Sequence, residues 1–248
     1  MITTRRALFS ILALLFFPKI NEAALSYPVT VSKTSMPSGG RRIAIDKYSP
    51  AHSGKHPAIL VLHGAGGTLL DGPEMRRVAR QLAESGNTAY LVHYFNRTGT
   101  VFGFDAGMQK NFPAWLETVR DSIKFAQQDN GDSGPIGIYG YSLGAFLALA
   151  AASDNSSVGV VVEHAGGIWN GKTERIKHMP PVLVVHGEGD SRVPFRKYAE
   201  QLVAVLRQRG TNFKPRFFPG EGHVFTAQAM AEVRAGAVEF FRAHLAKK

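Results

Sequence analysis

The pentapeptide G-Y-S-L-G at residues 140–144 places Ser142 between two glycines. It follows the apolar run 136–139, which predicts a strand, and precedes the alanine- and leucine-rich run 145–152, which predicts a buried helix. A sharp strand-to-helix turn would lift a serine hydroxyl clear of a sheet, and the crowding in such a turn requires glycine on both sides. The start of a helix also supplies N–H groups and the positive end of its dipole. These features predict that Ser142 is a nucleophile.

A serine hydroxyl attacks at neutral pH only when a base accepts its proton and an acid orients that base. Asp190 follows the apolar run 182–186, and the carboxyl ends of parallel strands open into a crevice. His223 lies further along the chain, in a glycine-containing loop before the last predicted helix. Glu188 is close enough in sequence to substitute for Asp190. A turn aspartate and an ordinary polar histidine are the alternative interpretations, but the order after the serine favours catalytic roles.

The segment H-G-A-G-G at residues 63–67 follows the apolar run 58–62. Attack on a carbonyl creates an oxyanion that needs preorganised hydrogen-bond donors. A loop of this kind can aim the N–H of Ala65 at the same point as the N–H of Leu143, the residue after the nucleophile. The segment lacks a following Lys-Ser/Thr and the spacing G-x-G-x-x-G, so a nucleotide site is not predicted.

Short apolar runs alternate with helical patterns along the chain, which predicts an α/β fold with a mostly parallel sheet covered by helices on both faces. No repeat or linker divides residues 24–248, so we expect a single domain. Residues 96–111 read as a long irregular segment and a candidate wall or lid of a site. The runs at 29–33, 42–48, 58–62, 88–94, 136–139, 158–163 and 182–186 predict strands, and those at 73–85, 112–128, 195–209 and 225–245 predict helices.

The composition excludes several classes of site. The chain has 248 residues and no cysteine, which excludes disulfides, thiolate metal sites and a cysteine nucleophile. Its net charge is +10, but the basic residues are scattered, and we predict no nucleic-acid partner. The chemistry expected of Ser142, Asp190 and His223 requires neither a metal nor an organic cofactor.

Residues 1–23 have the layout of a signal peptide. Two arginines precede the apolar run 7–17, and small residues follow it. The run is shorter than the roughly 20 residues that cross a bilayer, so we expect no stable membrane anchor. The paired arginines also resemble a twin-arginine signal. We therefore expect export to the periplasm or secretion, with a cleavage site that the sequence does not fix.

From residue 58 onward the chain resembles the dienelactone hydrolase family of the α/β-hydrolase fold. The resemblance rests on V-L-H-G-A-G-G (61–67), H-Y-F-N-R-T-G (93–99), G-Y-S-L-G (140–144), H-G-E-G-D-S-R-V-P (186–194) and G-E-G-H (220–223). It implies the α/β-hydrolase fold and Ser142, Asp190 and His223 as the catalytic residues. Two departures stand out: the family's cysteine nucleophile is replaced by serine, and no acidic residue follows the strand at 58–62 until Asp71.

These features predict an exported serine hydrolase that cleaves a small carboxylic ester or lactone through an acyl-enzyme. Arg97 and Arg192, which resemble the family's carboxylate-binding arginines, and Tyr94 and Trp115 are the candidate substrate-binding residues. A peptidase or amidase of the same fold, or a non-catalytic binding protein on this scaffold, remains the alternative. The sequence leaves the oligomeric state undetermined. Further aromatic residues that could line the pocket are Phe95, Phe102, Phe104 and Trp169.

Overall fold

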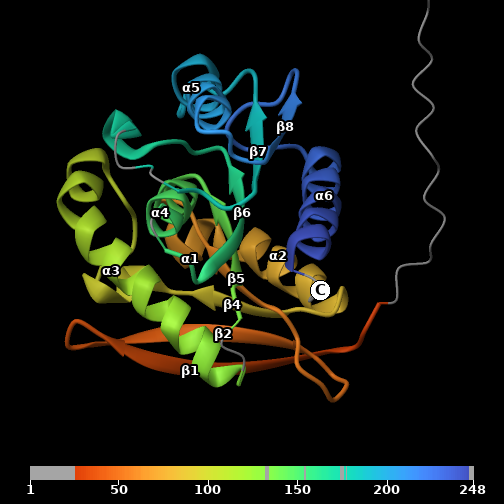
Figure 1. Cartoon of the computed structure of the whole chain (residues 1–248). Coiled ribbons are helices and arrows are strands. Elements are labelled where there is room, and N and C mark those ends of the chain that lie inside the picture. Colours follow the sequence, from red (N-terminus) through yellow and green to blue (C-terminus); the bar gives the residue numbers. More distant parts are fainter. Residues whose placement is uncertain (1–25, 132–133, 154, 174–175, 177, 246–248) are drawn as a thin grey trace, which may run out of the picture.

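The computed structural model describes residues 26–131, 134–153, 155–173, 176 and 178–245, so the predicted signal peptide lies outside the described residues. Its centre is an eight-stranded sheet of order β1-β2-β4-β3-β5-β6-β7-β8 (Figure 1). β1 and β2 form an antiparallel hairpin, β2 is antiparallel to β4, and all later neighbours are parallel. The strands are β1 (Val29–Ser38), β2 (Arg41–Pro50), β3 (Ala58–Leu62), β4 (Thr88–Val92), β5 (Ile136–Tyr141), β6 (Val158–His164), β7 (Val182–Gly187) and β8 (Phe213–Phe218).

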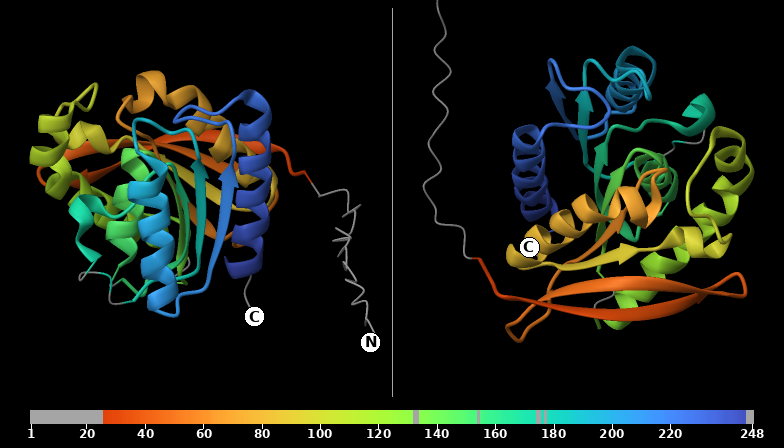
Figure 2. Two further views of the ribbon diagram at one scale, coloured as in Figure 1. Left: turned by 90° about the horizontal axis from the view of Figure 1, so that it is seen from above. Right: turned by 180° about the vertical axis from the view of Figure 1, so that it is seen from behind.

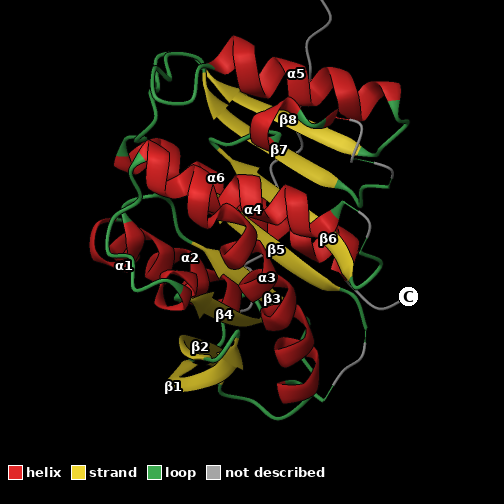
Figure 3. Cartoon of the chain, turned by 90° about the vertical axis from the view of Figure 1, so that its left-hand side faces the viewer, coloured by secondary structure: helices red, strands yellow, loops and turns green. Residues whose placement is uncertain are grey.

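Helices cover both faces of this sheet, which confirms the predicted fold class (Figures 2 and 3). α3, α4 and α5 pack on one face, and α2 and α6 pack on the other, each set around its own apolar core. β3 is completely buried between the two cores, which explains its unbroken apolar sequence. The helices are α1 (Gly67–Leu70), α2 (Gly72–Glu84), η1 (Tyr94–Arg97), α3 (Asp105–Asp129), α4 (Leu143–Ala152), η2 (Trp169–Gly171), α5 (Phe195–Gln208) and α6 (Ala227–Leu245).

The segment expected to be irregular, residues 96–111, is mostly helical, and this part of the sequence interpretation is wrong. η1 extends to Arg97, and α3 begins at Asp105 and continues through Pro113. A proline inside a helix removes one hydrogen bond, here to the carbonyl of Gln109, an exposed residue on the first turns of α3. The irregular part is therefore confined to residues 98–104.

No helix in the described part of the chain is both long enough and apolar enough to span a membrane.

Candidate active site

Ser142 occupies the turn between β5 and α4 with φ 52° and ψ −118°, a left-handed conformation that is costly for a residue with a side chain. The two neighbouring glycines make this turn possible. A Cβ on Gly140 would lie 2.3 Å from the carbonyl oxygen of Gly144, and a Cβ on Gly144 would lie 2.4 Å from the carbonyl oxygen of Leu62. The strand-to-helix turn expected from the pentapeptide is thus present, and its crowding accounts for both glycines.

Ser142, His223 and Asp190 lie in hydrogen-bond contact, although they are far apart in the sequence. His223 Nε2 is 2.9 Å from Ser142 Oγ, and His223 Nδ1 is 2.7 Å from Asp190 Oδ2. When Nδ1–H donates to the carboxylate, Nε2 presents its lone pair to the serine hydroxyl. Ser142 is 7% exposed, so it is largely buried but still reaches solvent.

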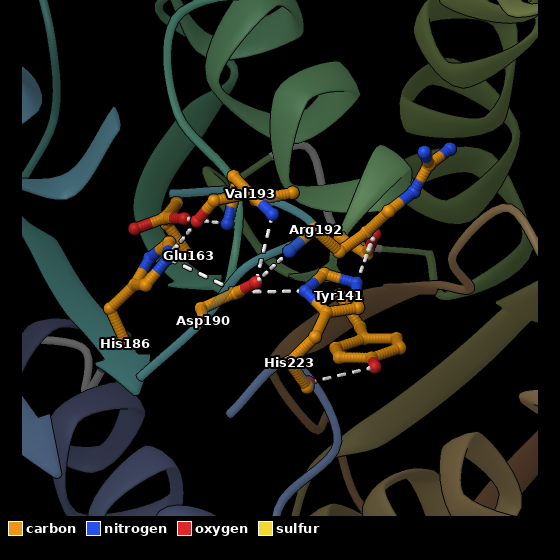
Figure 4. Close-up of polar contacts among 9 residues, drawn as sticks. Tyr141, Glu163, His186, Asp190, Arg192, Val193 and His223 are labelled. Carbon is orange, nitrogen blue, oxygen red and sulfur yellow. Dashed lines mark hydrogen bonds and ion pairs between the residues drawn. The ribbon is translucent and has the colours of Figure 1, made fainter. Parts of the chain in front are cut away.

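Asp190 is held by donors on three sides (Figure 4). Its Oδ1 accepts the backbone N–H groups of Arg192 and Val193, both at 2.8 Å, and His186 Nε2 lies 3.3 Å from its Oδ2. Burial raises the pKa of Asp190, but hydrogen bonds from His186, His223 and Val193 outweigh burial and bring this pKa well below its ordinary value. The carboxylate is therefore ionised throughout the neutral range. Glu188, the substitute acid, is exposed and lies outside this set of contacts.

Behind Asp190 lies a buried group of titratable residues that the sequence analysis did not single out for a role. Glu163 and His186 are each the last residue but one of the neighbouring strands β6 and β7, and both are fully buried. Glu163 Oε1 accepts the N–H of Gly166 at 2.5 Å, and His186 Nε2 lies 2.8 Å from the carbonyl oxygen of Val193. Burial raises the pKa of Glu163 to about 7, although His186 opposes the rise. Their position near the carboxyl ends of two predicted strands is the feature of the sequence that could have indicated a place near the site.

The glycine-rich loop after β3 faces Ser142. Ala65 and Leu143 line the same cavity as the serine, and no described residue accepts a hydrogen bond from either N–H group. Asp71 fixes the loop from behind, because its carboxylate accepts the N–H of Gly66 at 3.0 Å. A Cβ on Gly64 would lie 2.8 Å from Asp71 Oδ2 and 3.1 Å from Ser142 Cβ. Glycine at this position therefore leaves room for both Asp71 and Ser142 to approach the loop closely.

Asp71 and Tyr141 add two contacts that the spacing of motifs did not reveal. Burial raises the pKa of the Asp71 carboxyl group, and hydrogen bonds from the loop oppose the rise. Tyr141 OH donates to the carbonyl oxygen of His223 at 3.1 Å, which restrains the loop that carries this histidine. Tyr141 precedes Ser142 in the pentapeptide, so the sequence indicated that it lies near the site. The sequence did not indicate its hydrogen bond to the carbonyl of His223.

A cavity of about 260 Å³ opens beside Ser142. Of the two predicted substrate-binding arginines, Arg192 lines it and Arg97 does not. Arg97 bonds the carbonyl oxygen of Gly39 in the β1–β2 turn and pairs with Glu117 at 2.9 Å. The position of Arg97 in the H-Y-F-N-R-T-G segment did not reveal this, because its partners come from distant parts of the chain.

Tyr94 and Trp115 do not line this cavity, which corrects a second part of the prediction. Both side chains are fully buried in the core. Tyr94 OH donates to the carbonyl oxygen of His63 at 2.7 Å, and Trp115 Nε1 donates to Thr98 Oγ1 at 2.9 Å. They support the glycine-rich loop and η1 instead. Trp169 does line the cavity, together with residues that the sequence did not suggest: Asp105, Met108, Gln109, Phe146, Val193 and Tyr198.

Among the described residues, no group of three or more histidine or acidic side chains is arranged to hold a metal ion.

Comparisons with known proteins agree with this architecture. The model of the dienelactone hydrolase family matches residues 44–244. The dienelactone hydrolase-like promiscuous phosphotriesterase P91 from metagenomic libraries is 18% identical with a TM-score of 0.73, covering 87% of this chain and 98% of its own. A search of curated proteins gave no match.

Two further solved structures share the fold. Dienelactone hydrolase from Anabaena variabilis is 19% identical with a TM-score of 0.68, covering 87% of this chain and 98% of its own. An α/β serine hydrolase homologue from Coxiella burnetii is 20% identical with a TM-score of 0.66, covering 86% of this chain and 99% of its own. At these identities the likeness concerns the fold, whereas the family model covers most of the sequence. The chain therefore belongs to the dienelactone hydrolase family and is a hydrolase of the α/β-hydrolase fold.

Proposed function

We propose that the protein is a serine hydrolase that cleaves a carboxylic ester or lactone through an acyl-enzyme. The observation that supports this most is the contact of His223 with both partners, 2.9 Å to Ser142 Oγ and 2.7 Å to Asp190 Oδ2. A hydroxyl, an imidazole and a carboxylate in this order form the arrangement that activates serine for acyl transfer.

In the first half-reaction, Ser142 Oγ attacks the carbonyl carbon while His223 Nε2 takes the hydroxyl proton. The carbonyl oxygen becomes an oxyanion, which the N–H groups of Ala65 and Leu143 are placed to bind. The tetrahedral intermediate collapses, His223 returns the proton to the leaving oxygen, and the alcohol departs. In a lactone the leaving oxygen stays attached to the acyl group.

In the second half-reaction, water attacks the acyl-enzyme and His223 again accepts a proton. Collapse of the second intermediate releases the carboxylic acid and restores the Ser142 hydroxyl. His223 is positively charged at each transition state, next to the Asp190 carboxylate. The low pKa of Asp190 supports this role, because an ionised carboxylate stabilises the imidazolium without accepting its proton.

We also propose that residues 1–23 direct export of a single domain formed by residues 24–248. The paired arginines followed by the apolar run 7–17 support this proposal. In a bacterial host, mass spectrometry of the exported fraction should find a new N-terminus near residue 24. Intact chains retained in the cytoplasm would contradict export.

The test of the activity is a panel of nitrophenyl esters beside a lactone and a peptide amide. Ester or lactone turnover that disappears in Ser142→Ala, Asp190→Asn and His223→Ala supports the proposal. Ser32→Ala, at an exposed position, and His244→Ala, at a half-buried position of α6, change the same residue types away from this site and are the matched controls. Turnover of the amide above the esters would favour a peptidase. A folded wild-type chain that cleaves none of them would favour a binding protein.

A further inference from the structure

A second and larger cavity adjoins the one beside Ser142. It has a volume of about 550 Å³ and lies between α3, α4 and the segment after β6 that includes η2. Gln109 and Trp169 line both cavities, so the two spaces share a wall. The smaller cavity, at about 260 Å³, falls below the roughly 300–1,000 Å³ typical of ligand sites, whereas the larger one falls within that range.

Trp169 forms the shared wall. Its ring stacks on Phe112 with centroids 4.1 Å apart and meets the edge of Phe146 at 5.4 Å. Phe112 lines the larger cavity and Phe146 lines the smaller one. A ligand that begins at Ser142 and continues past Trp169 would therefore contact aromatic rings in both spaces.

A pair of amide hydrogen bonds at the surface joins Gln109 to Asn170, the residue that follows Trp169. Gln109 Nε2 donates to Asn170 Oδ1 at 3.2 Å, and Asn170 Nδ2 donates to Gln109 Oε1 at 3.1 Å. Asn170 has φ 53°, which asparagine tolerates better than most residues. The pair connects α3 to η2 and holds the shared wall in place.

The lining of the larger cavity combines apolar side chains with positive charge. Leu116, Leu149 and Ile168 supply apolar surface. Arg120 and Lys172 also line the cavity and are exposed, and neither forms an ion pair with a described residue. No acidic side chain belongs to the described lining. The cavity is thus complementary to an apolar group that ends in an anion.

We propose that the larger cavity binds the part of the substrate remote from the scissile bond, and that this part is an apolar chain or ring ending in a carboxylate. This proposal depends on the proposed serine hydrolase function for the position of the scissile bond. In this proposal the cavity beyond Trp169 determines how long a substrate the protein accepts. Arg120 and Lys172 give the preference for an anionic end. Arg192, in contrast, lines the smaller cavity beside Ser142.

The kinetic test compares nitrophenyl acetate, nitrophenyl octanoate and the mono-nitrophenyl ester of octanedioic acid. Ala150 lines the larger cavity but not the smaller one, so Ala150→Phe should fill the former. We expect it to lower kcat/KM for the two long esters at least tenfold and to change that for acetate less than twofold. Ala235→Phe, on the exposed side of α6, is the matched control. A second arm uses acetate esters of octanol and of 8-hydroxyoctanoate, which identifies whether the acyl or the alcohol side enters the cavity.

The charge test uses the double variant Arg120→Gln/Lys172→Gln. It should lower kcat/KM for the octanedioate ester about fivefold, which is the scale of exposed ion pairs, and leave the octanoate ester unchanged. Arg77→Gln, at an exposed arginine of α2, is the control. If the double variant affects the octanedioate and octanoate esters equally, the proposed anion preference is wrong.

A binding measurement keeps the inference separate from the proposed activity. Octanedioate should bind the Ser142→Ala protein in calorimetry, and Ala150→Phe should weaken that binding at least tenfold. Leu116→Ala, which enlarges the cavity, provides a second variant should Ala150→Phe fail to fold; it should favour a twelve-carbon over an eight-carbon diacid. The subsite would be overturned if octanedioate does not bind. It would also be overturned if neither Ala150→Phe nor Leu116→Ala changes octanedioate binding or the turnover of the long esters. Absence of all ester turnover with octanedioate binding intact would overturn the activity instead.

Discussion

Replacement of the buried Glu163 by glutamine should make the protein more stable at alkaline pH relative to the wild type. Glu163 is 0% exposed, and burial raises its pKa from the ordinary 4.5 to about 7. Because the folded state then holds the proton more tightly than the unfolded state, the contribution of this group is fully present below pH 4.5. It is lost as the pH rises through 7. The complete loss corresponds to about 3 kcal/mol, most of which falls between pH 5 and pH 8.

The glutamine variant does not titrate at this position, so its stability relative to the wild type should rise between pH 5 and pH 8. The rise belongs to the pair of Glu163 and His186, because the Glu163 carboxylate also raises the pKa of His186. The glutamine carbonyl oxygen can still accept the N–H of Gly166. Glu163 Oε2 has no hydrogen-bond partner in the described chain, so an amide nitrogen there adds a cost that is the same at every pH and cancels from the difference. His63 and His164, whose pKa values burial lowers to about 4 and about 3, titrate in both proteins and also cancel.

Urea denaturation at pH 5 and pH 8 measures this difference directly. Glu188→Gln, at an exposed glutamate past the end of β7, is the matched control and should follow the wild type at both pH values. A difference between Glu163→Gln and the wild type that is the same at pH 5 and pH 8 would refute the argument, because it would mean that burial does not displace the titration of Glu163.

Three further predictions concern the residues around Ser142. Asp190→Asn should reduce kcat about 10⁴-fold with an unchanged circular dichroism spectrum, because the amide cannot hold the His223 tautomer; a loss below tenfold would contradict this. Gly144→Ala should lower the free energy of unfolding by about 3 kcal/mol, measured in urea, since its Cβ would lie 2.4 Å from the carbonyl oxygen of Leu62; equal stability would argue against this turn. Tyr141→Phe removes the hydrogen bond to His223 and should reduce kcat less than tenfold at unchanged KM; a change in KM alone would indicate substrate contact.

The sequence predicted those features whose cause is local. Gly140 is such a case, because a side chain there would meet Gly144 and Ala145. Gly144 instead approaches Leu62 of the adjacent strand, and its glycine was predicted from the turn motif. The apolar runs of the parallel strands are likewise local, because burial on both faces leaves no alternation. Asp190 and His223 followed from chain order and from the edge of the sheet at which strands end.

The features that the sequence did not predict depend on distant parts of the chain. A tryptophan such as Trp115 can line a pocket or fill a core. Its packing against Phe95 places it in the core. Arg97 contacts the β1–β2 turn and α3, and the residues near Arg97 in the sequence do not indicate these partners. The first turns of α3 contain Gly107, a weak helix former, and precede Pro113, so the pattern favoured a loop where tertiary contacts support a helix.

The most direct test of the account is the site at which a fluorophosphonate probe attaches to the folded protein. Peptide mapping by mass spectrometry should place one adduct on Ser142, with no labelling in Ser142→Ala, full labelling in Ser32→Ala and slow labelling in His223→Ala. A wild-type protein that hydrolyses esters but carries the adduct on another residue, or that remains unlabelled, would contradict the assignment of Ser142 as the nucleophile.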